Sequence, residues 1–559
     1  MATPSHTELR HRSDIDGLRA IAVLAVVAFH ASKRIPGGFT GVDIFFVISG
    51  FLITSIILNG LIQKKFSFID FYVRRIRRIF PALALVLLTC WILGWFLLEP
   101  AAFAQLGKHM VAGAGFVSNV LLWSESGYFD PIAESKPLLH LWSLGIEEQF
   151  YLVWPAFLTL AWISRQKVYL WIVGLLFASF IINILGIRSY PVATFYLPFS
   201  RFWELLLGAL LAYINFNHSK LLQFSQDLIV ISWHRVVLSL GDIASLAGLL
   251  LILTGIFFVS EANSFPGWWA LLPTIGAFLL IAAGPKSAIN QALLSNRWMV
   301  SIGLISYPLY LWHWPLLTFG RMTLIGADHT RLTTLLMVLL SIVLSYMTCY
   351  FYERPLRYGF KKHGRVIASV LMGVITMVAI LGAVTNFEGG WSGRYPESVR
   401  PFLDYSYDYK ESFRNHRCLL SGAEQEFATE CSEKKAGEPL MLIWGDSHGA
   451  MLYRSLSDVA LTKGISVAQF TSSSCPPIIG FSKKDRPLCE PINNSILKKI
   501  IELKPATVVL AHDWPQSTSE NSLDRLPGTI ELLHKAGVQR VVLVGPVPHW
   551  GKSLHTKVG

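Results

Sequence analysis

The stretch "GLRAIAVLAVVAFH", from Gly17 to His30, decides the fold class of this chain. It is apolar enough to lie in a lipid bilayer, yet it carries an arginine near its start and a histidine at its end. Eleven positions at about 100° each return to within roughly 20° of one helix face, so Arg19 and His30 share a stripe, about 16 Å apart along the axis. Each residue alone also fits an interfacial position, where arginine commonly snorkels. Together they indicate a functional site, because ionisable groups are costly inside a membrane.

The composition is that of an integral membrane protein. Of the 559 residues, 53% are hydrophobic and 15% are charged, and the mean hydropathy is +0.47. These values exclude an ordinary soluble globular protein. The formal net charge is +12. Because the basic residues cluster in short loops between apolar segments, they indicate membrane orientation, and nucleic acid is not an expected partner.

Apolar segments long enough to cross a bilayer recur along the chain. A spanning helix needs roughly 17 to 25 mostly apolar residues, and about twelve segments approach that length. They lie at about 15–33, 41–62, 80–98, 106–123, 145–163, 168–187, 200–216, 242–260, 269–284, 303–325, 332–352 and 366–386. The first segment lacks a small-residue cleavage site and begins a series of spans, so we expect no cleaved signal peptide.

Loop charge sets the predicted orientation of these segments. Basic residues gather before the first segment and in several later loops, at 63–78, 164–167, 218–235, 284–297 and 353–365. All of them lie on the cytoplasmic side only if the segment 106–123, which holds Lys108, His109 and several glycines, does not cross. We therefore expect a polytopic α-helical membrane bundle of about eleven spans. The segment 106–123 becomes a re-entrant or surface helix, the N-terminus is cytoplasmic and the C-terminal region is exported.

The cysteines agree with this orientation. Two of them, Cys90 and Cys349, fall in predicted helices. The other four lie in the exported region, where disulfides persist. The nearest pairing joins Cys418 to Cys431 and Cys475 to Cys489, although the sequence alone does not fix it.

Polar groups interrupt several other predicted helices and indicate a polar cavity. They are Asp43, His140, Glu147, Glu148, Gln149, Arg201, Glu204, Tyr307 and His313. On the cytoplasmic side, "RRIRR" (74–78) presents four guanidinium groups. Arginine forks fit phosphate oxygens, although a basic juxtamembrane run also fits a topology signal or a lipid-headgroup contact.

Several motifs in this order resemble the membrane acyltransferase-3 family over residues 13–360, with an additional transmembrane helix at 366–386. They are the Arg19-to-His30 spacing, "GVDIFFVISGF", "RRIRRIFP", "LWSLGIEEQFYLVWP" and "YPLYLWHWP". The resemblance implies an O-acyltransferase that acetylates extracytoplasmic carbohydrate with acetyl-CoA as donor, without a metal. It matches Arg19 and His30 to the family's essential arginine and histidine, and Arg74, Arg75 and Arg78 to its basic motif. Glu147 and Tyr307 match recurring polar positions, one in a catalytic and one in a cofactor-binding role.

The resemblance gives the stripe on the first helix a mechanism. The arginines hold the phosphates of acetyl-CoA near the cytoplasmic side, and the pantetheine arm reaches along the bundle toward His30. The imidazole then acts as general base on the acceptor hydroxyl or carries the acetyl group transiently. Both roles of His30 are hypotheses.

The exported region begins with a linker or irregular extension at 387–438, rich in glycine, proline, serine and tyrosine over its first part. Beyond it, strand-like runs at 440–444, 465–470, 506–511 and 540–548 alternate with helical ones such as 529–537. This alternation predicts an α/β domain with a mainly parallel sheet over 439–559.

The sequence "GDSHG" (445–449) directly after the first of these strands resembles the first block of SGNH-type esterases and acyltransferases. The resemblance makes Ser447 the nucleophile, with Asp446 shaping the turn and Gly480, beside the backbone at Ser447, forming an oxyanion hole. Two departures stand against it. The expected asparagine block reads "AHDW" (511–514), and no Asp-x-x-His follows Ser447. We expect that the domain is partial and truncated; His549 and His555 are weak substitutes, because neither has a suitably placed acidic residue.

These features predict a bacterial inner-membrane O-acetyltransferase, multi-pass, with an extracytoplasmic C-terminal domain. The expected partners are acetyl-CoA, the lipid bilayer and an envelope glycan. The resemblance of the fused architecture to O-antigen acetyltransferases implies lipopolysaccharide O-antigen as the first acceptor. Peptidoglycan, an exopolysaccharide or a macrolide-like molecule are alternatives, and either the bundle or Ser447 makes the final transfer. A transporter or flippase is the rival class, but we find no inverted repeat. An anchored esterase would not need so many spans.

Overall fold

The chain forms two compact units in the computed structural model, residues 1–395 and 396–559. The structure describes residues 11–32, 34–126, 135–164, 167–218, 223, 229–233, 236–260, 262–323, 331–359, 363–403, 408–420, 424, 426–432, 434–482, 486–514 and 523–545. Each unit is described by itself.

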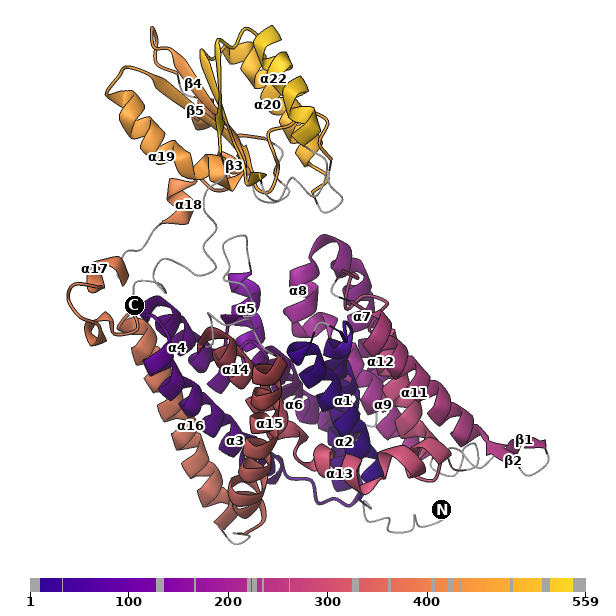
Figure 1. The fold of residues 1–559 in the computed structure, drawn as a ribbon. Helices are drawn as coiled ribbons and strands as arrows, with labels where there is room; N and C mark the ends of the chain where they lie inside the picture. Colours follow the sequence, from indigo (N-terminus) through magenta and orange to yellow (C-terminus); the bar gives the residue numbers. More distant parts are fainter. Residues whose placement is uncertain are drawn as a thin grey trace. The chain divides into compact units, whose positions relative to one another are not determined.

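The first unit is a bundle of helices that run side by side (Figure 1). Its α-helices are α1 (Ser13–Ala31), α2 (Gly41–Ile62), α3 (Phe68–Leu97), α4 (Pro100–Ala114), α5 (Ser118–Glu125), α6 (Leu141–Ile163), α7 (Val168–Ser189), α8 (Pro191–Tyr196), α9 (Phe202–Asn217), α11 (Leu240–Phe258), α12 (Leu271–Ala283), α13 (Arg297–Leu304), α14 (Ser306–Thr323), α15 (Arg331–Met347) and α16 (Gly364–Phe387). An antiparallel pair, β1 (Ile229–Trp233) and β2 (Val236–Ser239), precedes α11, and π-helical turns η5 (Thr348–Glu353) and η6 (Pro355–Gly359) follow α15.

Most predicted segments coincide with one helix, but three differ. Helix α3 begins at Phe68, so the basic run 74–78 lies inside a helix and not in the loop before it. The segment 303–325 divides into α13 and α14. The segment 106–123 divides between α4, which packs against α16 and α3, and the short α5.

Length and apolar character identify the first unit as a membrane domain. Among the described residues, six helical segments are long and apolar enough to cross a membrane, at 38–62, 68–97, 168–189, 240–258, 331–359 and 364–387. Large side chains such as Phe96, Phe258 and Phe387 are 76%, 77% and 88% exposed, as expected for a surface that faces lipid. Helices α9 and α12 are apolar but shorter. The count of about eleven spans stays a prediction.

Helices α2 and α9 cross closely at the centre of the bundle. A Cβ atom added to Gly50 would lie 1.8 Å from the carbonyl oxygen of Leu205, and one added to Gly208 would lie 2.0 Å from that of Val47. Small residues allow this approach, which lets dispersion forces hold helices together in lipid. The same pair carries a buried ion pair, in which Arg201 Nη2 lies 2.9 Å from Asp43 Oδ1.

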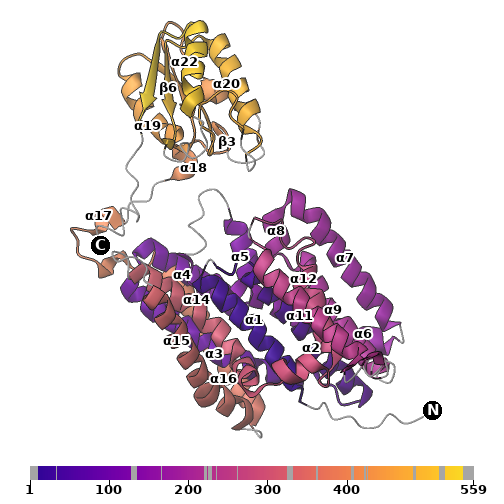
Figure 2. The same ribbon diagram turned by 45° about the vertical axis from the view of Figure 1, so that its right-hand side comes forward.

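The second unit is an α/β domain with a five-stranded sheet among its described residues. The strands lie in the order β3–β5–β4–β6–β7 and every neighbouring pair is parallel, as the sequence predicted. They are β3 (Leu419–Leu420), β4 (Leu440–Gly445), β5 (Ser466–Ser472), β6 (Thr507–Ala511) and β7 (Arg540–Val544), with helices α19 (Ser447–Leu461), α20 (Cys489–Leu503) and α22 (Leu526–Lys535) between them. Figure 2 shows the helices against the sheet.

Residues from the predicted linker or extension contribute to this unit. The short β3 pairs with β5, and a disulfide joins Cys418, directly before β3, to Cys431. A second disulfide joins Cys475 to Cys489. Both disulfides join cysteines that are nearest in sequence, which is the pairing that the sequence analysis named. The free cysteines, Cys90 and Cys349, are buried in the helical bundle.

Candidate active site

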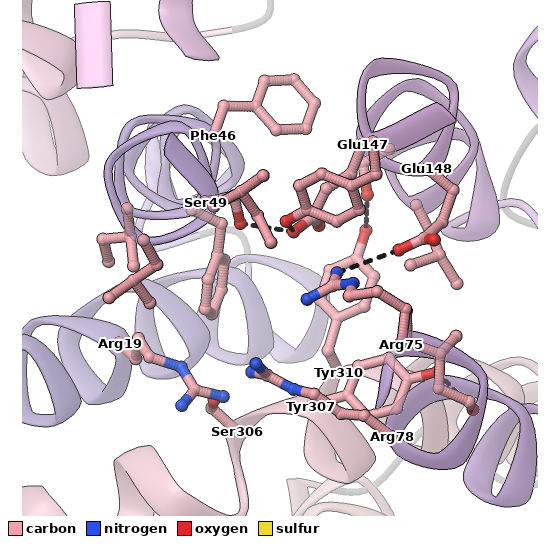
Figure 3. Close-up of a pocket in the computed structure, with 18 of the residues that line it drawn as sticks. Arg19, Phe46, Ser49, Arg75, Arg78, Glu147, Glu148, Ser306, Tyr307 and Tyr310 are labelled. Atoms are coloured by element: carbon pink, nitrogen blue, oxygen red, sulfur yellow. Dashed lines mark hydrogen bonds and ion pairs between the residues drawn. The ribbon is translucent and has the colours of Figure 1, made fainter. Parts of the chain in front are cut away.

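The first cavity, which we call the Arg19 cavity, lies among α1, α2, α3, α6 and α14 (Figure 3). Its volume is about 260 Å³. Apolar residues of α2 form one wall, and charged and phenolic side chains form the other. The polar lining comprises Arg19, Ser49, Arg75, Arg78, Ser143, Glu147, Glu148, Tyr151, Ser306, Tyr307 and Tyr310.

Two carboxylates of α6 organise this lining. Glu147 accepts hydrogen bonds from the hydroxyls of Ser49 and Tyr151. Glu148 pairs with Arg75, whose Nη2 lies 3.1 Å from Oε1. The guanidinium of Arg75 also lies 3.9 Å from the centre of the Tyr151 ring, which favours a cation–π contact. The two neighbouring carboxylates therefore have different partners, because Glu147 binds hydroxyl groups and Glu148 orients an arginine.

The arginines of the cavity differ in how far protein partners engage them. Arg19 Nη1 lies 3.4 Å from Asp16 Oδ1 on its own helix. In the described part of the chain, no carboxylate lies within ion-pairing distance of Arg78, whose guanidinium points toward that of Arg19 in Figure 3. Arg74 is exposed and is absent from the cavity lining. The sequence grouped Arg74 with Arg75 and Arg78; the helical geometry of α3 turns it away.

Tyr307 lines the Arg19 cavity, and its hydroxyl donates to the carbonyl of Ile79 at 2.9 Å. Ile79 belongs to α3, directly after the basic run. The contact therefore ties the start of α14 to the helix that carries the arginines. The hydroxyl hydrogen of Tyr307 is therefore already used in a hydrogen bond within the protein.

A second cavity, the His30 cavity, lies at the other end of α1 and has a volume of about 290 Å³. Aromatic rings dominate its wall. Its lining comprises Val26, Phe29, His30, Phe39, Val42, Asp43, Leu139, His140, Trp142, Phe195, Tyr196, Arg201, Asn263, Phe265, Tyr310 and Trp314. Arg19 and His30 thus open onto two different cavities along the same helix.

The imidazole of His30 is held by α14. Its Nδ1 lies 3.0 Å from Nε2 of His313, and its ring packs edge-on against Trp314 with centroids 4.4 Å apart. Arg321 donates to the backbone carbonyl of His30. These contacts join residues about 290 positions apart, and they fix the ring at the cavity wall.

The two cavities share part of a wall, formed by Val42 of α2 and Tyr310 of α14. Tyr310 is anchored to α6, because its hydroxyl lies 2.6 Å from Ser143 Oγ and donates to the carbonyl of His140 at 2.8 Å. A ligand that reaches from one cavity to the other therefore has to pass these two side chains. The sequence analysis assigned no role to either residue.

In the second unit, Ser447 begins α19 directly after β4, in the predicted strand–turn–helix geometry. Asp446 is the N-cap of that helix, and its Oδ1 accepts the backbone N–H of His448 at 2.8 Å. Gly445 is required at this turn, since a Cβ atom there would lie 1.8 Å from the carbonyl oxygen of Ala511. The side chain of Ser447 is half-buried.

His512 is a site residue that the sequence reasoning missed. Its Nδ1 lies 2.6 Å from Oδ2 of Asp446. Burial alone would raise the pKa of the Asp446 carboxyl, but hydrogen bonds from His448 and His512 outweigh burial and hold that pKa below its usual range. The hydrogen bond to Asp446 raises the pKa of His448. The sequence held a usable signal, because carboxyl ends of adjacent parallel strands meet at one sheet edge, and β4 and β6 pair Gly445 with Ala511.

The predicted oxyanion partner of Ser447 is Gly480, and that role stays a prediction. Gly480 adopts φ +74°, and its carbonyl accepts from Arg525. His549 and His555 lie outside the described residues. The described part of the chain holds no group of three or more histidine, cysteine or acidic residues suited to a metal ion.

Comparison with known families agrees with both units. The model of the acyltransferase domain (acyltransferase-3) matches residues 12–354. The chain belongs to the acyltransferase-3 family. A second model, the SGNH domain fused to such acyltransferase-3 domains, matches residues 411–558. The order of the two matches is the order that the sequence motifs predicted.

Relatives of this acyltransferase-3 chain include named O-acetyltransferases. O-acetyltransferase OatA of Staphylococcus aureus (strain NCTC 8325 / PS 47) is 31% identical over 398 residues, which are 68% of this chain and 64% of that protein. Peptidoglycan O-acetyltransferase OatA of Listeria monocytogenes (strain ATCC BAA-679 / EGD-e) is 33% identical over 358 residues, 61% of this chain and 55% of that protein. The chain thus spans less than two thirds of the length of these relatives.

Among solved structures, the periplasmic domain of the lipopolysaccharide acetyltransferase of Salmonella ser. Paratyphi A matches 28% of this acyltransferase-3 chain and 61% of its own. The sequence identity is 24% and the TM-score is 0.22. A superposition this loose supports no conclusion about the site.

Proposed function

We propose that this chain transfers an acetyl group from acetyl-CoA to a hydroxyl group of a cell-envelope glycan. The observation that carries the proposal is the pair of cavities on α1. One is lined by guanidinium groups and the other by the His30 imidazole, and Val42 and Tyr310 separate them. Acetyl-CoA has anionic phosphates at one end and a thioester at the other, so it needs two such environments in sequence.

The Arg19 cavity would hold the phosphate end of the donor. Arg78 is the best suited to phosphate oxygens, because Arg75 already pairs with Glu148 and Arg19 with Asp16. The arm of the donor then passes Val42 and Tyr310 and brings the thioester to His30. No metal ion is needed for this step, since the imidazole supplies the acid–base chemistry.

At His30 two roles fit the proposal. As a general base, the imidazole removes the proton of the acceptor hydroxyl, which attacks the thioester carbonyl. As a nucleophile, it carries the acetyl group before the acceptor takes it. The aromatic rings and polar side chains of the His30 cavity suit a sugar, whose apolar ring face packs on aromatic groups while its hydroxyls form hydrogen bonds.

For the acceptor, lipopolysaccharide O-antigen and peptidoglycan remain the proposed glycans, with an exopolysaccharide as a further alternative. The Listeria relative is named for peptidoglycan, which favours that acceptor. We place the chain in the bacterial inner membrane, with the Arg19 cavity open to the cytoplasmic side. Residues 396–559 then lie on the outer side, where Ser447 receives the acetyl group or positions the glycan.

The proposed function is tested by measuring where a labelled acetyl group is transferred. Membranes that carry the full chain are incubated with acetyl-labelled CoA and purified envelope glycan, and label is measured on glycan and on protein. His30→Ala should reduce label on the glycan by at least about 100-fold. Full transfer by His30→Ala would refute the proposal, and a transporter would leave no covalent label on either product.

The Ser447→Ala variant tests which of the two units transfers the acetyl group to the glycan. If Ser447 hands on the acetyl group, label on the glycan falls to background in this variant. If the helical bundle acetylates the sugar itself, label on the glycan persists, and residues 396–559 serve to position the acceptor. Label that accumulates on His30 without acceptor and is released by mild acid or hydroxylamine would distinguish an acetyl-imidazole from base catalysis.

A further inference from the structure

The contact between His30 of α1 and His313 of α14 bears on which nitrogen of His30 carries a hydrogen, as well as on the position of its ring. Nδ1 of His30 and Nε2 of His313 are 3.0 Å apart, and the two rings are inclined by only 19°. Two imidazole nitrogens at this distance form a hydrogen bond in which one donates and the other accepts. Which of them donates decides which nitrogen of His30 is left for substrate.

The partner of the other ring nitrogen of His313, Nδ1, decides the direction of this hydrogen bond. Its Nδ1 lies 3.1 Å from the backbone carbonyl oxygen of Leu309, one turn earlier on α14. A carbonyl oxygen only accepts, so this Nδ1 carries the hydrogen, and in a neutral ring Nε2 is then the acceptor. His30 must therefore donate from Nδ1, which leaves the lone pair of His30 on Nε2.

The surroundings of His313 favour the neutral ring. The side chain is 0% exposed, and its ring neighbours among the described residues are His30, His140 and Tyr310. No carboxylate of the described residues contacts it. An imidazolium buried without a counter-charge is costly. A charged His313 would also present an N–H group to His30 Nδ1 and so reverse the hydrogen bond.

We propose that His313 is a positioning residue, which fixes His30 as the tautomer with its proton on Nδ1 and its lone pair on Nε2 in the His30 cavity. The inference rests on the proposed function, in its general-base form. Nε2 takes the proton of the acceptor hydroxyl, the oxygen bonds to the thioester carbonyl carbon, and the C–S bond breaks. The departing thiolate takes the proton back from Nε2, so free CoA and the acetyl ester are the products. Throughout these steps, Nε2 of His313 accepts the hydrogen bond from Nδ1–H of His30.

Two amide variants of His313 test the acceptor role. Glutamine reaches the position of Nε2 and offers an oxygen there, whereas the shorter asparagine reaches only the position of Nδ1. In the full chain in membranes, His313→Asn should lower kcat by about 100-fold, within the range attributed to acid–base groups. The KM for acetyl-CoA should stay close to wild type, since the Arg19 cavity is unchanged. His313→Gln should recover at least tenfold of the loss in kcat.

A matched control lies next to it on α14. Trp312 Nε1 donates to Thr348 Oγ1 at 3.0 Å, and Trp312→Phe removes this buried hydrogen bond without touching His30. Its kcat should stay within about twofold of wild type, because the bond is purely structural. If asparagine and glutamine at position 313 give equal kcat, or if Trp312→Phe is as slow as His313→Asn, the inference fails. If His30→Ala itself stays active, the proposed function fails, and the two failures are distinct.

Discussion

The two cavities along α1 differ in the chemistry of their walls. The Arg19 cavity gathers guanidinium, carboxylate and phenol groups, whereas the His30 cavity gathers aromatic rings around the imidazoles of His30 and His140. Guanidinium groups suit an anionic ligand, and aromatic rings suit a neutral ligand with an apolar face. The difference indicates that one helix serves two ligands, a phosphate-bearing donor and a neutral acceptor, and that they meet at the shared wall.

The largest effect should follow from closing that wall. Val42→Trp fills the boundary between the cavities, so acetyl transfer should fall by about 100-fold or more, as for misplaced reacting groups. Binding of CoA in the Arg19 cavity should persist, which equilibrium binding of labelled CoA measures. Val42→Ala leaves the boundary open and should retain transfer. Equal activity in both variants would show that the donor does not cross there.

The next effect should separate three of the four arginines of α3, Arg74, Arg75 and Arg78. Arg78→Ala should raise the KM for acetyl-CoA by about 10-fold or more, since a charged hydrogen bond contributes roughly 1.5 to 3 kcal/mol. Arg75→Ala should raise it less, because Arg75 already pairs with Glu148. Arg74→Ala should change it by less than about twofold, since an exposed side chain away from the cavity contributes little. Steady-state kinetics with acetyl-CoA varied provide the ranking, and a dominant Arg74 would contradict it.

A smaller effect should appear on the acceptor side. Phe39 lines the His30 cavity, and its ring packs edge-on against Phe265 at 4.8 Å between centroids. Phe39→Ala should raise the KM for the glycan by roughly 3- to 10-fold, the value of one aromatic contact. The KM for acetyl-CoA should not move, whereas Phe39→Tyr should resemble wild type. A rise in both KM values would mean that the cavities are not separate ligand sites.

The smallest effect lies outside both cavities, at the helix cap before Ser447. Asp446→Ala should destabilise the first turn of α19 by about 0.5 to 1 kcal/mol, as expected for the loss of an N-cap. Hydrogen exchange at the N-terminal amides of α19 in the full chain measures this. Asp446→Asn keeps the cap and should lose less. Binding of CoA in the Arg19 cavity should be unaffected in both variants, since neither change touches that cavity.

The same cap predicts a pH dependence. The lowered pKa of Asp446 stabilises the fold fully above its unfolded value of about 4, and this contribution fades as the pH falls through the lower folded pKa. The raised pKa of His448 stabilises the fold below about 6.5, and this contribution fades as the pH rises through the folded pKa. Protection of α19 should therefore be greatest between roughly pH 4 and 6.5. In Asp446→Asn the profile should flatten.

Much of this organisation is visible in single segments. The β4–α19 turn is encoded locally, because "GDS" combines the glycine that fits against Ala511 with the aspartate that caps the helix. The parallel strands follow from short apolar runs between helical ones. By contrast, the exposure of Arg74 follows from α3 starting at Phe68, before the apolar segment that the hydropathy marked.

The sequence by itself determined that Arg19 and His30 occupy one helix in a membrane bundle, because hydropathy and a fixed helical period act over neighbouring residues. It also determined the order of the two units and the turn that carries Ser447. Only the tertiary structure decided that His313 faces His30 and that Val42 and Tyr310 divide the cavities. These pairs are brought together by packing between segments as far as 283 residues apart, which no local pattern encodes.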